Sequence, residues 1–167
     1  MSCLGVHFSL SEKEVHKLKS FKKDDARLEY LQEDIEETYM DEHEDRTAQT
    51  DKSWDAMHRA LADGDLSYKT GPYPLRLTVI GGEPIYSAGD YIMSLKTPSE
   101  VQDVATALSA ITKEDFRKRY DTIDEGKYGF PRTDEDFDYT WEWFTGVVTF
   151  YQKAAEEKRW VLFTADQ

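Results

Sequence analysis

Residues 134–158 restrict the possible folds more than any other part of the chain. Apolar side chains recur there at intervals of three and four residues, which predicts one long helix. One face carries Phe137, Trp141, Phe144, Val148, Tyr151 and Ala155, and a second carries Trp143, Val147 and Phe150. A helix that is apolar on two faces must be covered on both, so we expect it near the centre of its domain.

The rest of the chain predicts a small sheet around that helix. Residues 4–10 alternate Val6 and Phe8 with smaller or polar residues, and residues 160–164 are largely apolar, so both ends read as strands. We expect these two strands to pair, with short strands at 75–80 and 91–95 beside them. A length of 167 residues suits one core. The predicted fold is a single compact α+β domain over residues 1–167, with about four short strands, about six helices and the longest helix near the C-terminus.

Local signals mark where the helices begin. Ser11-x-x-Glu14 and Thr112-x-x-Asp115 have the spacing of a capping box, in which a hydroxyl and a carboxylate satisfy free backbone N–H groups. Thr97-Pro98-Ser99-Glu100 adds a proline at the first helical position. Two further helices are predicted, one opening at Asp24 and one over residues 51–63. We expect loops at 40–50, 66–74, 83–90 and 124–133.

The charge of the chain is acidic and uneven. The 34 acids exceed the 21 lysines and arginines by 13. Residues 24–45 hold eleven acids and one basic residue, Arg27. Because phosphate backbones and anionic membranes attract basic surfaces, we expect no nucleic-acid and no membrane partner. A basic protein is the expected partner, and these are the acids expected to meet it: Glu33, Glu36, Glu37, Asp41 and Glu42.

The sequence also suggests where the protein resides. No apolar run of about 18 residues is present, and the first residues lack the pattern of a signal peptide. The single cysteine, Cys3, has no internal disulfide partner. We therefore expect a cytoplasmic protein; the sequence carries no signal about oligomeric state.

Motifs for metals and cofactors are incomplete. Asp134-x-Asp136-x-Asp138 resembles the start of a calcium loop, but the sixth and twelfth positions hold Tyr139 and Thr145 in place of Gly and Glu. The run 41–45 is interpreted as a solvated acidic loop. Gly81-Gly82 continues into Glu83 and Pro84, unlike a phosphate-binding loop. No metal and no cofactor are predicted.

His58 is the one candidate for catalysis. It follows Trp54 by four residues on the inward face of its helix, and Asp51 and Asp55 are close in sequence. An imidazole flanked by carboxylates can act as a general base. The alternative, which we favour, is a buried histidine hydrogen-bonded within the core.

Several segments together resemble the YfbM-like family of bacterial proteins, a domain of unknown function. They are the Met1–Gly5 start, residues 51–58, 74–82 and 95–101, and Tyr139-Thr140-Trp141. The resemblance implies a compact α+β domain in a bacterial cytoplasm and no particular activity. It also implies that a shared site would include Trp54, His58 and Trp141.

Two functions follow as hypotheses. The first is a non-enzymatic acidic domain that binds a basic protein, as an immunity protein neutralises a toxin. The alternative is a small hydrolase or ligand-binding enzyme that uses His58 with Asp51 or Asp55.

Overall fold

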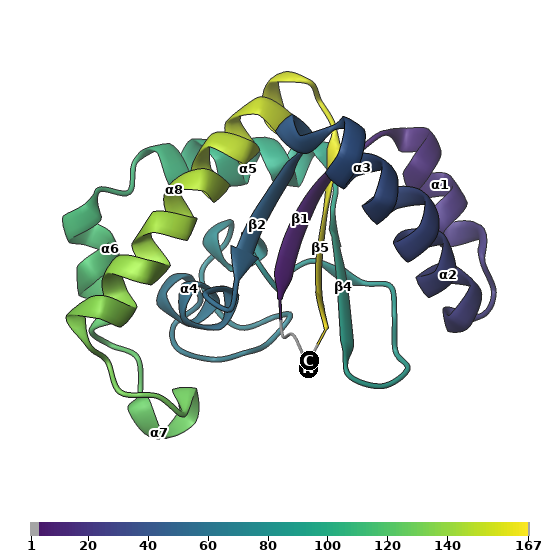
Figure 1. Cartoon of the computed structure of the whole chain (residues 1–167). Coiled ribbons are helices and arrows are strands. Elements are labelled where there is room, and N and C mark those ends of the chain that lie inside the picture. Colours follow the sequence, from purple (N-terminus) through teal and green to yellow (C-terminus); the bar gives the residue numbers. More distant parts are fainter. Residues whose placement is uncertain (1–3, 167) are drawn as a thin grey trace.

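The computed structural model describes residues 4–166, which form one sheet between two groups of helices (Figure 1). The strands lie in the order β2-β1-β5-β4-β3, and all neighbours are antiparallel. They are β1 Gly5–Leu10, β2 Thr47–Asp51, β3 Glu83–Pro84, β4 Tyr91–Lys96 and β5 Trp160–Asp166. β1 pairs with β5 from Gly5 opposite Ala165 to Leu10 opposite Trp160. The α+β class and the pairing of the terminal strands are confirmed, although the sheet has five strands; Cys3 lies outside the described residues.

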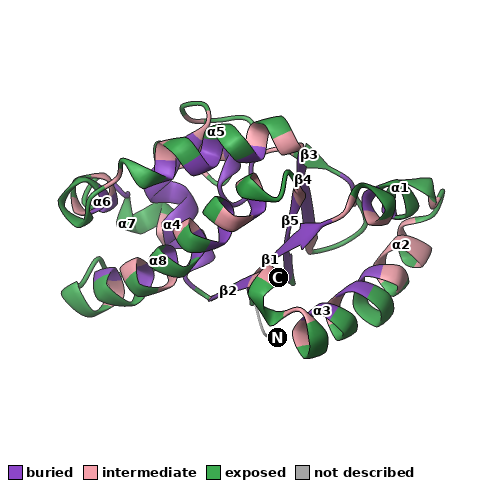
Figure 2. Ribbon diagram, turned by 90° about the horizontal axis from the view of Figure 1, so that it is seen from above, coloured by how far each residue is buried: buried purple, intermediate pink, exposed green. Residues whose placement is uncertain are grey.

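Helices cover both faces of the sheet (Figure 2). One layer holds α1 Glu12–Ser20, α2 Asp24–Tyr30, a π-helical turn Leu31–Glu36 and α3 Glu37–Glu42. The other side holds α4 Trp54–Leu61, α5 Pro98–Ser109, α6 Lys113–Tyr120, α7 Glu125–Tyr128 and α8 Asp134–Glu156. Two 3₁₀ turns lie at Glu44–Arg46 and Leu75–Leu77. With both faces covered, the inner strands β1, β5 and β4 bury both their odd and their even residues. None of the helices within residues 4–166 is long and apolar enough to cross a membrane.

The predicted helix starts are confirmed by their hydrogen bonds. The Ser11 hydroxyl accepts from the Glu14 N–H at 3.2 Å, and Glu14 Oε1 accepts from the Ser11 N–H at 2.9 Å. The same reciprocal pair forms at Thr97 with Glu100 and at Thr112 with Asp115. Each box satisfies backbone donors locally, so the start of the helix depends on a few adjacent residues.

α8 is the predicted long helix and contacts α5, β2, α4 and α6. The expectation that it is covered on both faces is wrong, because one face is exposed along the whole helix, from Glu135 to Glu156. Its buried side chains are Phe137, Thr140, Phe144, Val147, Phe150, Tyr151 and Ala154. Phe144 stacks on Phe116 of α6, with ring centroids 4.5 Å apart. Thr133 caps the helix by accepting from the Asp136 N–H, so the Asp134–Asp138 run is a helix start.

The prediction of a loop at residues 40–50 is wrong. α3 continues to Glu42, a 3₁₀ turn follows, and β2 pairs with β1 at the edge of the sheet. These residues carry no local hydrophobic period that would predict a strand. β2 forms because the edge of β1 offers free backbone hydrogen-bonding groups. The expected loop at 83–90 likewise begins with β3, and that at 124–133 contains α7, which Asp124 caps.

The prediction of a strand at residues 75–80 is also wrong. Residues 75–81, named the buried segment below, form a 3₁₀ turn and then irregular turns. Most of them are fully or nearly fully buried, among them Leu77, Val79 and Ile80. Their β-branched composition suits a strand, but their backbone groups bond within local turns and to side chains rather than to a neighbouring strand.

Candidate functional site

His58 lies on α4 with none of its surface exposed. Its Nδ1 accepts a hydrogen bond from the backbone N–H of Ile80 at 3.3 Å. The ring proton must therefore be on Nε2, which donates to the Ser67 carbonyl at 3.2 Å. Backbone groups thus use both nitrogens and select one neutral tautomer.

This environment disfavours a charged imidazole. The pKa of His58 is lowered to about 4, mainly by burial and in smaller part by Lys96 and Arg59, against the raising effect of the Ser67 carbonyl. The ring is therefore neutral at pH 7 but has no exposed nitrogen. A hydrolase that used His58 as its base would have no access from solvent to that base.

The two carboxylates considered with His58 lie elsewhere. Asp51 ends β2 and accepts from the Lys52 N–H at 2.7 Å. Asp55 accepts from Arg59 Nε at 2.6 Å, one turn along α4. Among residues 4–166, no hydrogen bond or ion pair joins His58 to either carboxylate. The structure does not bring the three together.

His58 instead belongs to a set of polar side chains around the buried segment. Tyr151 Oη and His7 Nε2 both donate to the Thr78 carbonyl at 2.8 Å. Lys96 Nζ donates to the Val79 carbonyl at 2.5 Å, and Ser94 Oγ donates to the Gly81 carbonyl at 2.8 Å. A buried irregular backbone needs such partners, because an unpaired polar group costs about 1–3 kcal/mol.

Lys96 was not singled out by the sequence, and Tyr151 was expected only as a core residue of the long helix. Both are fully buried, and burial holds the pKa of Lys96 well below its ordinary value. The signal for Lys96 was its register: Ile92, Ser94 and Lys96 alternate along β4, so the lysine points to the same face as a core isoleucine.

The two tryptophans of the candidate site are also apart. Trp54 is 5% exposed and lies 6.1 Å, centroid to centroid, from Phe163 of β5. Trp141 packs on α8 against Phe116 and Phe144, each 5.6 Å away. Trp54 lines a surface cavity together with Asp55, and Trp141 is not among the residues that line it.

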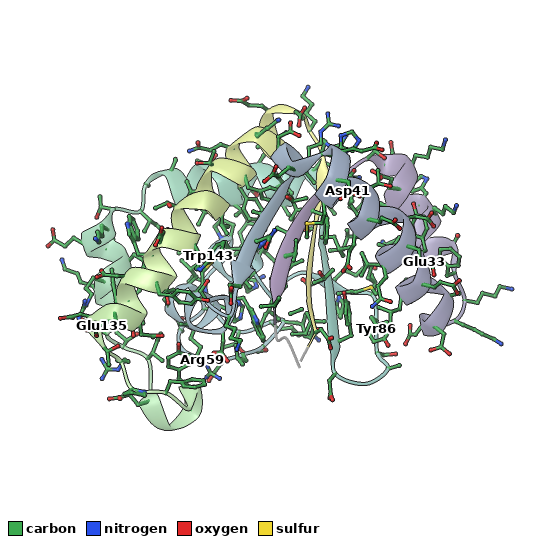
Figure 3. All side chains as sticks on the ribbon, viewed as in Figure 1. Glu33, Asp41, Arg59, Tyr86, Glu135 and Trp143 are labelled. Carbon is green, nitrogen blue, oxygen red and sulfur yellow. The ribbon has the colours of Figure 1, made fainter. Side chains whose placement is uncertain are left out.

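The acids of α2, the π-helical turn and α3 form a row on the outside of the molecule. Five of them, all exposed, recur every fourth residue and are named the acidic row: Asp25, Glu29, Glu33, Glu37 and Asp41. Figure 3 labels Glu33 and Asp41 on this outer layer. None of the ion pairs among the described residues involves a member of the row.

Two other predicted acids lie near the row. Glu42 is exposed beside its end. Glu36 is half-buried and accepts from Tyr91 Oη at 3.0 Å, and burial raises the pKa of its carboxyl. Glu36 therefore faces the sheet and does not belong with the exposed acids.

The π-helical turn explains why the row stays on one side. An α-helix turns 3.6 residues at a time, so a strict four-residue repeat would drift around it. A wider π-helical turn at Leu31–Glu36 offsets that drift. The buried side chains Leu31, Ile35 and Tyr39 also recur every four residues, and this shared period was the sequence signal for the turn.

Like charges four residues apart destabilise a helix, so Glu33→Gln is expected to stabilise the fold. The change removes repulsion from Glu29 and Glu37, worth about 0.5 kcal/mol in all. Urea unfolding followed by circular dichroism measures it. The control Glu135→Gln removes an acid from the first turn of α8 and should destabilise slightly. A loss of stability in Glu33→Gln would mean that this acid has a favourable partner.

Comparison with known proteins places this geometry in a family. The sheet covered on both faces, with both terminal strands at its centre, defines a single α+β domain of undetermined activity. The chain matches the family described as a domain of unknown function (DUF1877) over residues 1–164, and it belongs to that family. Among curated proteins, none matches the chain.

A solved structure shows the same fold. It is the crystal structure of YfbM, a protein of unknown function from Escherichia coli, with a TM-score of 0.62 and 17% sequence identity. The match covers 97% of this chain and 99% of that chain. The predicted YfbM-like resemblance is therefore confirmed.

Within residues 4–166, no three His, Cys, Asp or Glu side chains are grouped so that they could hold a metal ion. The acids at 41–45, interpreted from the sequence as a flexible loop, belong to α3 and the following 3₁₀ turn.

Proposed function

We propose that the chain is a non-enzymatic protein-binding domain whose acidic row receives a basic protein, in the manner of an immunity protein. The observation that carries the proposal is the row itself. It runs about 24 Å along one side of a continuous helical segment. A cytoplasmic location is part of the same proposal.

Physical chemistry supports this surface as a binding face. The row keeps like charges adjacent at a cost to the stability of its own helix. Ion pairs among residues 4–166 do not neutralise it, so its field extends into solvent. Such a field speeds the encounter with a basic partner and excludes acidic ones. None of the five members of the row lines a pocket found among the described residues, and a small substrate needs a cavity, so the row suits a protein surface better.

The experiment compares three immobilised proteins as baits for proteins from the source cells. One is the unmodified chain. The second carries Glu29→Gln, Glu33→Gln, Glu37→Gln and Asp41→Asn. The third is a control with the same change in charge, in which four exposed acids of α8 are replaced: Glu135→Gln, Asp138→Asn, Glu142→Gln and Glu156→Gln.

A basic protein should be retained by the unmodified chain and by the control, and lost from the variant of the row. Raising the salt from about 50 to 300 mM should release it, because the screening length falls below about 10 Å. If the same proteins bind to all three baits, or if binding is insensitive to salt, the row is not the binding face.

A further inference from the structure

The elements α4, α7 and the start of α8 surround a cavity of about 460 Å³, on the opposite side of the sheet from the acidic row. Its aromatic and acidic lining residues are Trp54, Asp55, Tyr128, Phe130, Asp136 and Tyr139. The volume lies in the range of sites for small molecules.

Exposed apolar side chains gather at this cavity. Among the described residues, five large hydrophobic side chains are exposed, and three of them, Leu66, Phe130 and Tyr139, line it. Phe130 is 64% exposed and makes an edge contact with Tyr128, with centroids 5.4 Å apart. A concentrated exposed apolar surface is typical of a binding site.

The polar groups of the cavity are mainly acidic. Asp136 accepts from Tyr120 Oη at 2.6 Å and from Tyr128 Oη at 3.1 Å. Asp55 binds Arg59 through Oδ1, and among the hydrogen bonds of residues 4–166 none uses its Oδ2. Burial raises the pKa of Asp55, and the charge of Asp136 raises it further, against the lowering effect of Arg59. A bound cation would relieve this repulsion.

The one basic residue that lines the cavity is Lys52, which is exposed. Within residues 4–166 it forms no ion pair and no cation–π contact. The acids of the lining therefore outnumber its bases.

We propose that this cavity binds a small organic cation, an ammonium group carried on an apolar body. The rings of Tyr128 and Phe130 meet at 63°, so they form a corner rather than a flat platform. The face of an aromatic ring attracts a cation through the ring quadrupole, and this attraction is absent for a neutral ligand of the same shape. The carboxylates of Asp55 and Asp136 receive the charge.

The test is calorimetric titration of the whole chain at pH 7 with three probes of similar shape: 2-phenylethylammonium, 2-phenylethanol and phenylacetate. The ammonium probe should bind saturably and about tenfold more tightly than the alcohol. Phenylacetate should bind more weakly than the alcohol, because the cavity is acidic.

Matched variants identify the groups responsible. Asp136→Asn keeps an acceptor for the tyrosines and should remove most of the preference for ammonium over alcohol, whereas Asp138→Asn, two residues along α8 and exposed, should keep it. Phe130→Ala should weaken binding about fivefold. Tyr73→Ala removes an exposed ring that does not line the cavity and should leave binding unchanged.

The proposal is overturned if the alcohol binds as tightly as the ammonium probe, or if Asp136→Asn and Asp138→Asn behave alike. Absence of saturable binding at about 10 mM ammonium probe would also overturn it. The variant that neutralises the acidic row should retain this binding, so failure of one proposal is distinguishable from failure of the other.

Discussion

Acidification from pH 7 to pH 4.5 is expected to remove about 5 kcal/mol from the free energy of unfolding. Burial lowers the pKa of His58 to about 4 and that of His7 to about 3, from an ordinary value of 6.5. Below pH 6.5 the unfolded chain therefore binds two protons that the folded chain does not. Each histidine then costs about 1.4 kcal/mol per pH unit until the pH falls below its folded pKa.

This effect is large compared with the total stability of a domain, about 5–15 kcal/mol. The protein should therefore begin to unfold between about pH 4 and 5. Urea unfolding followed by tryptophan fluorescence at pH 7, 6, 5 and 4.5 measures the slope. Carboxyls with lowered pKa, such as Asp24 and Asp115, add to the loss only as the pH approaches their ordinary pKa of 3.8. Glu36 and Asp55 act in the opposite sense, because their folded pKa is raised.

Two variants separate the histidines from the carboxyls. His58→Gln should lower stability at pH 7, because the glutamine amide cannot reproduce both hydrogen bonds of the ring. It should also reduce the dependence of the unfolding free energy on pH, above pH 5, by about one proton. His16→Gln changes an exposed residue of α1 and should keep the slope of the unmodified chain. An unfolding free energy that stays constant from pH 7 to 5 would show that the two rings bind protons in the folded state.

Gly81→Ala is expected to destabilise the protein by about 3 kcal/mol or more. An added Cβ would lie 2.0 Å from the Arg76 carbonyl oxygen and 2.7 Å from its carbon. Both atoms are backbone, and the Gly81 N–H already donates to that oxygen at 3.0 Å. The turn cannot open without disturbing the carbonyls that Lys96 and Ser94 hold.

The matched control is Gly146→Ala in α8. An added Cβ there has nothing within 4 Å, so the change should stabilise the helix by about 0.4–1 kcal/mol. Thermal and urea unfolding of both variants give the comparison. Equal stability of Gly81→Ala and the unmodified chain would mean that the buried segment is loosely packed and that the bonds around it matter little.

Much of the fold follows from local rules. The capping pairs at Ser11, Thr97 and Thr112 fix the start of three helices because all their partners lie within three residues. The apolar period of residues 134–158 likewise predicted a long helix, although only one of its faces is buried. Glu33 and Glu37 are exposed as expected, whereas Asp41 and Glu42 belong to α3 and not to the expected loop. Glu36 faces Tyr91, a residue 55 positions away.

The errors occur where a distant partner decides the conformation. Nothing near residues 47–51 marks a strand, because β2 forms on the free edge of β1. The buried segment has the composition of a strand, but Tyr151, His7 and Lys96 satisfy its carbonyls from three separate elements.

Composition and spacing thus predicted the class of fold, the long helix near the C-terminus and the paired terminal strands, and the resemblance of several segments indicated the family. The tertiary structure decided that His58 serves a buried backbone, that Asp55 and Asp136 meet beside aromatic rings, and that the acidic row stays on one side. The physical reason is range: caps and apolar periods are satisfied within one or two turns, whereas edge pairing, backbone partners and cavities depend on residues that only folding brings together.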